Sequence, residues 1–170
     1  MRVKIDLKLP SNLWTAKDTL VLAQNTVASI KLRTSKGIDA TGVSFDNYST
    51  KPIYVAFKGA RLKPKGGRPS RTNKSIYYAR GYRQYKQESR RRTPGGEGQS
   101  AEVDLVLSGQ LMNNLVVLEA TRDRFKIGLT KHVKSYGYHV NDKREYIGLT
   151  DDEVDVLVDA IALDLAEKLK

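Results

Sequence analysis

The sequence predicts an α+β fold: a small, mostly antiparallel sheet packed against helices, with flexible basic loops between some of these elements. Short segments alternate apolar and polar residues as half-buried strands do, and longer segments repeat apolar residues every three or four positions as amphipathic helices do. Glycines, prolines and asparagines separate the two kinds of segment. A chain of 170 residues can bury one sizeable core, and no internal repeat divides it, so we expect a single domain over residues 1–170.

The N-terminal part of the chain predicts one strand and one helix. Residues 2–9 alternate strictly between polar and apolar side chains, which is typical of a half-buried strand, and a proline follows them. Thr15 and Asp18 have the spacing of a capping box, and apolar residues then recur at intervals of four and three as far as Ile30. We therefore expect a helix that starts near residue 16 and ends near Gly37.

The middle of the chain is expected to hold short elements. Turn-forming residues break residues 38–54 into pieces, and we expect Phe45 and Tyr48 to attach this loop to the core. Residues 53–57 predict one short strand. Residues 76–89 predict an amphipathic helix, because three tyrosines recur there at helical spacing with basic residues between them. These tyrosines are Tyr78, Tyr82 and Tyr85.

Residues 103–118 are predicted to form the structural nucleus. The pattern indicates a short strand over residues 103–107, a tight turn at Ser108 and Gly109, one helical turn, and an apolar exit strand. The residues expected to form this nucleus are Leu105, Leu107, Gly109, Leu111, Met112 and Leu115. The segment has no reactive group, so the function must lie in surfaces and partners.

The last third of the chain predicts one more strand and two helices. Residues 124–129 alternate as a strand, and residues 130–138 predict a short polar helix that Gly137 helps to stop. Thr150 and Glu153 form a second capping-box pattern at the start of a closing helix. The apolar stripe of that helix is expected to comprise Val154, Leu157, Val158, Ile161, Leu165 and Leu169.

The net charge of +11 is concentrated in one segment. Residues 58–92 contain 13 Lys or Arg residues and one acidic residue, whereas the rest of the chain carries 17 basic and 18 acidic side chains. Such a block repels itself and tends to stay solvated or to meet an anionic partner. We expect a flexible basic loop or arm over residues 58–75, and a flexible link, rich in glycine, over residues 90–100.

This basic segment supplies the candidate partner-binding residues. Tyr and Arg are enriched at protein interfaces, and Lys and Arg also bind nucleic-acid phosphates without regard to sequence. The candidates are Lys63, Lys65, Arg68, Arg71, Lys74, Arg80, Arg83, Lys86, Arg90, Arg91 and Arg92. The alternatives are ordinary core packing for the three tyrosines and a solvated, disordered loop for the basic block.

Catalytic and metal-binding functions have little support. The chain has no cysteine, and its two histidines, His132 and His139, stand seven residues apart with no supporting carboxylate pattern. Ser108 does not lie in a nucleophile elbow, and residues 66–70 do not form a Walker loop. We expect no enzymatic activity, no metal and no cofactor. Since no apolar run reaches about 18 residues and the N-terminus does not resemble a signal peptide, we also expect no membrane association and no export.

Four segments resemble, in their order along the chain, motifs of the phage tail-completion and virion-morphogenesis proteins, a broad group of small head-to-tail joining proteins. They are FDNYS at residues 45–49, GYRQYK at 81–86, DL at 104–105 with LSGQLM at 107–112 and Leu115, and REYIGLTD at 144–151. Together they span the chain from about Gly42 to its C-terminus. The long basic loop departs from the minimal pattern of this group.

The resemblance implies a structural, non-enzymatic virion protein of the neck or tail end, such as a tail-completion, tail-terminator or head-to-tail joining protein. Such proteins work as rings, so a homo-oligomer of six-fold or twelve-fold symmetry is expected. The implied partners are portal, connector or tail-tube proteins, with non-specific contact to DNA in the ring lumen as a further expectation. The implied location is the virion, and the host cytoplasm during assembly.

The alternative is a basic nucleic-acid-binding module. In that case the tyrosine and arginine residues of the 76–89 segment would lie against the phosphate backbone or stack on exposed bases. No helix-turn-helix, zinc-finger or RNA-binding aromatic signature occurs in the sequence, so virion assembly is the favoured hypothesis.

Overall fold

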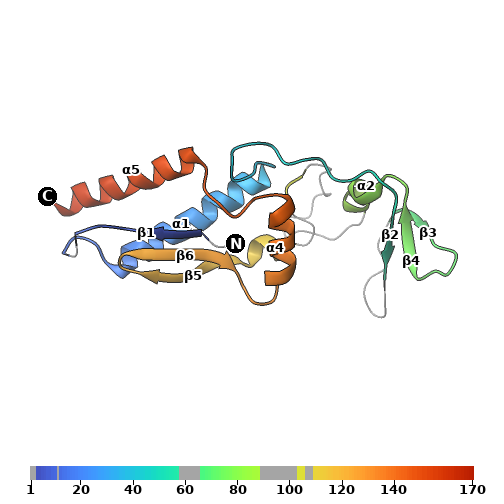
Figure 1. Ribbon diagram of the computed structural model, residues 1–170, viewed down its shortest axis with the longest axis horizontal. Coiled ribbons are helices and arrows are strands. Elements are labelled where there is room, and N and C mark those ends of the chain that lie inside the picture. Colours follow the sequence, from blue (N-terminus) through green and yellow to red (C-terminus); the bar gives the residue numbers. More distant parts are fainter. Residues whose placement is uncertain (1–2, 11, 58–65, 89–102, 106–108) are drawn as a thin grey trace. The chain divides into compact units, whose positions relative to one another are not determined.

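The computed structural model describes residues 3–10, 12–57, 66–88, 103–105 and 109–170, which belong to two compact units (Figure 1). Unit 1 comprises residues 1–45 and 110–170, and unit 2 comprises residues 46–109. Each unit has its own three-stranded antiparallel sheet and at least one helix. The predicted α+β class with antiparallel strands is confirmed, with two small sheets in place of one. The single domain over residues 1–170 stays a prediction.

The sheet of unit 1 has the strand order β1-β6-β5. Its strands are β1 (Val3–Asp6), β6 (Arg124–Leu129) and β5 (Leu115–Thr121), so the predicted strands at both ends of the chain are confirmed. In the register Ile5 lies opposite Phe125, which places the apolar side chains of neighbouring strands on one face. The opposite face is charged, and there Glu119 pairs with the basic side chains of β6.

Helix α1 (Ala16–Ser35) packs on the apolar face of this sheet (Figure 1). It begins with the predicted capping box: the Thr15 backbone N–H donates to the Asp18 carboxylate at 2.8 Å, and the Thr15 hydroxyl accepts from the Asp18 backbone N–H at 3.3 Å. Phe125 and Ile127 of β6 and Ile30 of α1 are completely buried. These residues form the centre of the unit 1 core.

Three further helices complete unit 1. Helix α3 (Gln110–Asn113) is the predicted helical turn before β5, and α5 (Asp151–Lys168) is the predicted closing helix with its capping box. Helix α4 (Lys134–Lys143) begins and ends later than the predicted helix over residues 130–138. Gly137 does not stop it, because this glycine lies inside the helix where a Cβ atom would come within 2.1 Å of Leu129. The absence of a side chain at Gly137 lets α4 pack closely against Leu129.

Unit 2 contains β2 (Ile53–Ala56), β4 (Ser75–Tyr78) and β3 (Arg68–Pro69) in the order β2-β4-β3, followed by α2 (Gly81–Glu88). The helix predicted over residues 76–89 is therefore wrong in its first part, which forms strand β4. Ile and Tyr favour strands, and pairing with β2 and β3 outweighs the helical spacing of the tyrosines.

The loop predicted over residues 58–75 is corrected in its described part. Arg68 and Pro69 pair with β4, and Asn73 adopts a positive φ of 52° in the turn that joins the two strands. Asn tolerates this conformation better than most residues. Residues 58–65, and the predicted flexible link over residues 90–100, lie outside the described residues.

The predicted nucleus divides between the two units at residues 109 and 110. Leu105, Leu111, Met112 and Leu115 are buried as expected, and Leu107 lies outside the described residues. The strand predicted over residues 103–107 is wrong for residues 103–105, because Leu105 has a φ of +53° that extended backbone does not allow. Gly109 has a φ of +70°, in agreement with the predicted turn.

Among the described residues no helix is both long and apolar enough to cross a bilayer.

Phe45 and Tyr48 are buried as predicted.

Candidate partner-binding surfaces

The tyrosines with helical spacing form the core of unit 2. Tyr78 is completely buried, and its ring packs edge-on against that of Tyr85 at a centroid distance of 5.3 Å. Tyr82 is partly buried between Tyr85 and Tyr48, at centroid distances of 5.7 and 5.0 Å. The alternative of ordinary core packing therefore holds for Tyr78 and Tyr85, and these two rings do not form a partner surface.

A different pair of tyrosines, the exposed Tyr54 and the half-buried Tyr77, lies on the opposite face of the same sheet. Tyr54 of β2 lies opposite Tyr77 of β4, which lies opposite Arg68 of β3. The two rings are 4.9 Å apart, and the Tyr54 side chain is 67% exposed. Residues directly opposite one another in a sheet share a face, so the three side chains form one row across the strands.

The β3–β4 turn adds two cations near this row. Arg71 and Lys74 are exposed in a turn that is closed by a 2.8 Å hydrogen bond from the Ser70 backbone N–H to the Ser75 carbonyl oxygen. We call the set Tyr54, Tyr77, Arg68, Arg71 and Lys74 the tyrosine–arginine face. Three of its members were predicted as partner-binding residues. The two tyrosines were missed, although the alternation that defines strand faces identifies them once β4 is known to be a strand.

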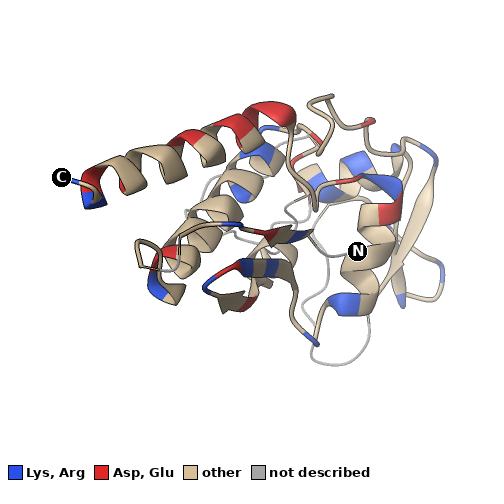
Figure 2. Ribbon diagram, turned by 60° about the vertical axis from the view of Figure 1, so that its left-hand side comes forward, with Lys and Arg blue, Asp and Glu red and all other residues tan. Residues whose placement is uncertain are grey.

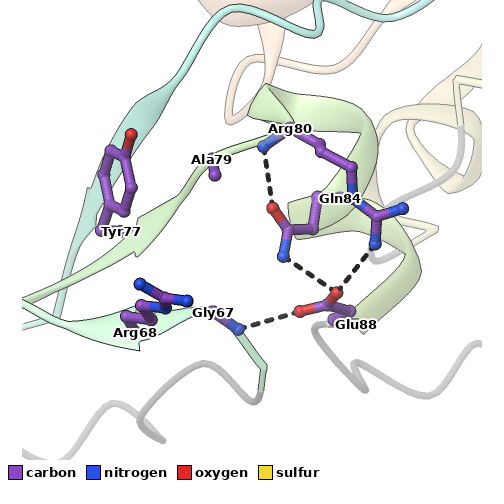
Figure 3. Close-up of a pocket in the computed structure, with 7 residues that line it drawn as sticks. All are labelled: Gly67, Arg68, Tyr77, Ala79, Arg80, Gln84 and Glu88. Carbon is purple, nitrogen blue, oxygen red and sulfur yellow. Dashed lines mark hydrogen bonds and ion pairs between the residues drawn. The ribbon is translucent and has the colours of Figure 1, made fainter.

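A cavity of about 670 Å³ lies beside Arg68 and Tyr77, between the sheet and α2 (Figure 3). Glu88 lines this cavity and links its two sides. The Glu88 carboxylate accepts from the Gly67 backbone N–H at 2.8 Å and from the Gln84 side-chain amide at 3.0 Å. The Arg80 guanidinium lies 3.6 Å from the same carboxylate and remains 74% exposed. One carboxylate thus partly offsets the positive charge of the cavity wall.

Lys86 does not belong to a partner surface, and its prediction as a binding residue is corrected. Its side chain is completely buried, forms an ion pair with Asp104, and lies 5.0 Å from the centroid of the Tyr48 ring. On an eight-residue helix, one side must face the core, and Lys86 lies on that side with Tyr85. Arg83 is exposed as predicted.

The other candidate binding residues lie outside the described residues: Lys63, Lys65, Arg90, Arg91 and Arg92.

In unit 1, polar contacts attach α5 to its surroundings at both ends. The buried Arg33 guanidinium pairs with Glu153 and donates to the carbonyl oxygens of Tyr146 at 2.8 Å and Gly148 at 3.2 Å. Burial lowers the pKa of Arg33, and the Glu153 carboxylate opposes this effect. At the other end the Lys168 ammonium lies 2.8 Å from the Asp18 carboxylate.

The apolar side chains of α5 are only partly covered. No residue of this 18-residue helix is buried. Leu157, Ile161 and Leu165 of the predicted stripe are half-buried, as expected for the side that faces α1. The other members of that stripe are exposed, and so are two large apolar residues outside it. The exposed set is Val154, Val156, Val158, Leu163 and Leu169.

One side of α5 alternates acidic and apolar residues. Asp152, Val156, Asp159, Leu163 and Glu167 follow one another at spacings of four and three, so they lie on one side of the helix, and all five are exposed. We call them the outer stripe. The helix as a whole contains seven acidic residues and one basic residue, and Figure 2 shows the acidic positions recurring along it.

A small cavity of about 120 Å³ lies between α1 and α5, next to the outer stripe. It is lined by Leu22 and Thr26 of α1 and by Val156, Leu157 and Ala160 of α5, among others. The contact between the two helices is therefore incompletely filled.

Neither histidine has the surroundings of a metal site. His132 and His139 are exposed, and within the described part of the chain no three His, Asp or Glu side chains are grouped so that they could hold a metal ion.

Comparisons of the chain with protein-family models, with curated proteins and with solved structures give no match.

Proposed function

We propose that this chain is a structural protein of a phage virion that acts at the neck or tail end, in tail completion or head-to-tail joining. It would assemble as a ring by non-covalent docking to neighbouring subunits and to the adjoining connector or tail-tube ring. The observation that carries the proposal is α5, a helix on which Val156 and Leu163 are 67% and 68% exposed. Folded monomers seldom leave extended apolar surface uncovered unless it serves as an interaction site.

The two candidate surfaces support an assembly protein because they differ. The outer stripe of α5 is acidic and apolar, whereas the tyrosine–arginine face is basic and aromatic. A subunit of a cyclic ring must present two different surfaces to its two neighbours, since head-to-tail contacts are heterologous. Tyr and Arg also contribute disproportionately to protein binding energies.

The order of the four sequence motifs supports the same proposal and points to the neck or tail end. The fold gives three of these motifs structural roles: Tyr48 and Tyr85 lie in buried positions, and the last motif ends at the capping box of α5. Motifs with such roles would be expected in proteins that share a scaffold and differ in their surfaces.

A second candidate function, a basic nucleic-acid-binding module, is favoured by one observation. Tyr54, Tyr77 and Arg68 form a row on one face of a small sheet, with Tyr54 and Arg68 exposed and Tyr77 half-buried. Aromatic and guanidinium groups in such a row can stack on bases while nearby cations contact phosphates. The acidic, apolar α5 has no role in this function.

The experiment that tests the proposal is affinity purification of the chain from a phage-producing host, with nuclease-treated and untreated halves compared by mass spectrometry. Recovery of portal, connector or tail-tube proteins in both halves is expected. Recovery of nucleic acid without virion proteins, removed by nuclease or by high salt, would contradict the proposal and favour the second candidate.

A further inference from the structure

Building on the ring function proposed above, we propose that the outer stripe of α5 in one copy binds the tyrosine–arginine face of unit 2 in the next copy. Each copy would then use its helix toward one neighbour and its sheet toward the other. The occupant of the uncovered helix is thus a second copy of this chain.

The charges of the two surfaces are complementary. Segment 46–109, which forms unit 2, contains 14 Lys or Arg and five acidic residues, whereas α5 contains seven acidic residues and one lysine. Two acidic residues of α5, Glu153 and Asp164, already have basic partners within unit 1. Asp152, Asp159 and Glu167 are exposed on the outer stripe. Complementary potentials steer association and disfavour incorrect contacts.

The spacings of the two surfaces also agree. Residues three or four positions apart on a helix are separated by about 4.5–6 Å along its axis. Neighbouring strands of a sheet are about 4.8 Å apart, so Tyr54, Tyr77 and Arg68 recur at a similar interval. A helix laid across the strands would therefore place one apolar stripe residue beside the tyrosine rings and the next acidic residue near Arg68.

The cavity between α1 and α5 gives this contact an anchor point. Residues that dominate binding energies usually occupy pockets that exclude water, and Tyr is among the commonest of them. The cavity opens beside Val156, which belongs to the outer stripe, and Tyr54 is the most exposed ring of the opposing face.

The proposed contact is head-to-tail, so it joins more than two copies unless a pair closes on itself. When two copies bind in this way, one helix and one sheet face of the pair are still free, unless the two copies bind each other reciprocally. Further copies therefore add at the free surfaces until a ring closes or a filament grows. The resemblance to head-to-tail joining proteins implies the ring, of six-fold or twelve-fold symmetry.

The test is charge reversal in the full-length chain. The helix variant Asp159→Lys/Glu167→Lys and the face variant Arg68→Glu/Arg71→Glu change only exposed side chains, and both positions in the helix lie outside its first turn, where lysine would oppose the helix dipole. The matched control Asp142→Lys/Glu145→Lys reverses two exposed acidic residues of unit 1 outside α5. Circular dichroism establishes that each variant is folded.

Sedimentation velocity then measures self-association. We expect concentration-dependent oligomers for the wild-type chain and the control, weakened by added salt, and association at least about tenfold weaker for each variant alone, because like charges face each other. An equimolar mixture of the two variants should regain oligomers, since each reversed helix then meets a reversed face. The oligomers in the mixture must alternate the two variants.

Three results would overturn the docking proposal: a wild-type chain that stays monomeric at all concentrations, variants that associate as the wild type does, or a mixture that does not recover. Failure here is distinguishable from failure of the proposed function. If the variants do not affect self-association but portal or tail-tube proteins still co-purify with the chain, the virion role stands and the neighbour contact lies elsewhere.

Discussion

At the residue scale, the buried ion pair of Lys86 and Asp104 determines the packing of α2. The Lys86 side chain is completely buried, whereas Asp104 remains 22% exposed. An ammonium group cannot be buried without compensation, and Asp104 and the face of the Tyr48 ring supply part of it. The pair therefore connects α2 to the residues just before the boundary between the two units.

Asp104→Ala is expected to destabilise the protein more than Lys86→Met does. The first change removes the carboxylate and leaves the ammonium buried, at a cost of about 3 kcal/mol, whereas the second leaves a partly exposed carboxylate that water can solvate. Urea unfolding of both variants measures the difference. An Asp104→Ala protein as stable as the wild type would show that the pair contributes nothing to the fold.

The contact between Asp18 and Lys168 is expected to make stability depend on acid pH. Hydrogen bonds from Lys168 and from Thr15 lower the pKa of Asp18 from 3.8 to about 2. Because the folded-state pKa is depressed, the stabilisation is present above about pH 4 and is lost as the pH falls toward 2. The free energy of unfolding of the wild type should therefore exceed that of Asp18→Asn at pH 5, and the difference should shrink by pH 2. A difference that is constant over this range would contradict the assignment.

At the scale of elements, glycine conformation decides where β4 ends and α2 begins. Gly81 has a φ of +64°, and a Cβ atom there would lie 2.5 Å from the carbonyl oxygens of Ser49 and Lys51. Strand and helix can follow each other within a few residues because glycine turns the chain at this point.

Gly81→Ala is expected to cost about 3 kcal/mol or more, since it adds overpacking to backbone strain. Gly42→Ala is the matched control: φ is +85° there, but the nearest atom to the new Cβ is 4.0 Å away, so strain alone costs about 1–2 kcal/mol. Thermal and urea unfolding compare the two variants. Equal losses would show that the close approach to residues 49 and 51 is relieved by movement of that loop.

The exposed side of α5 and its covered side should respond differently to substitution. Ile161→Asp places a charge against α1 and is expected to reduce the free energy of unfolding by about 2 kcal/mol. Leu163→Asn changes a side chain that is 68% exposed and should leave stability within about 0.5 kcal/mol while weakening self-association. Loss of stability in Leu163→Asn would place this residue in the fold and not in the interface.

At the scale of the whole molecule, the described part of the chain has two cores, one in each unit. Unit 1 has a sheet covered by α1 with Phe125 and Ile127 completely buried, and unit 2 has a cluster of Ile76, Tyr78 and Tyr85. Unit 2 is inserted between two segments of unit 1, because residues 1–45 and 110–170 fold together.

Replacing residues 46–109 with a flexible glycine–serine linker of about ten residues is expected to leave a cooperatively folded unit 1. Circular dichroism and a single thermal transition would establish this. In the shortened chain, Phe125→Ala removes a central core side chain and should abolish the thermal transition or lower its midpoint strongly. A shortened chain without a cooperative transition would support the single domain expected from the sequence.

The sequence by itself determined those strands and helix starts that are specified by residues close to one another in the chain. The alternation in β1 and β6 and the capping boxes of α1 and α5 predict these elements correctly, because a strand face or a helix start is specified by residues within a few positions. The concentration of basic residues in residues 58–92, which lie within unit 2, is also visible from composition. Three of the five residues of the tyrosine–arginine face followed from it.

Only the tertiary structure decided which side chains are covered. Tyr78 lies in a strand and not in a helix because β2 and β3 pair with it, Lys86 is buried because Asp104 and Tyr48 surround it, and much of α5 is exposed although its sequence is amphipathic. Each outcome depends on segments distant in the sequence or, for α5, on the lack of a covering segment among the described residues. A periodic pattern shows that an apolar side exists, but the partner that covers it is fixed by packing over the whole chain or, as proposed for α5, by a second copy.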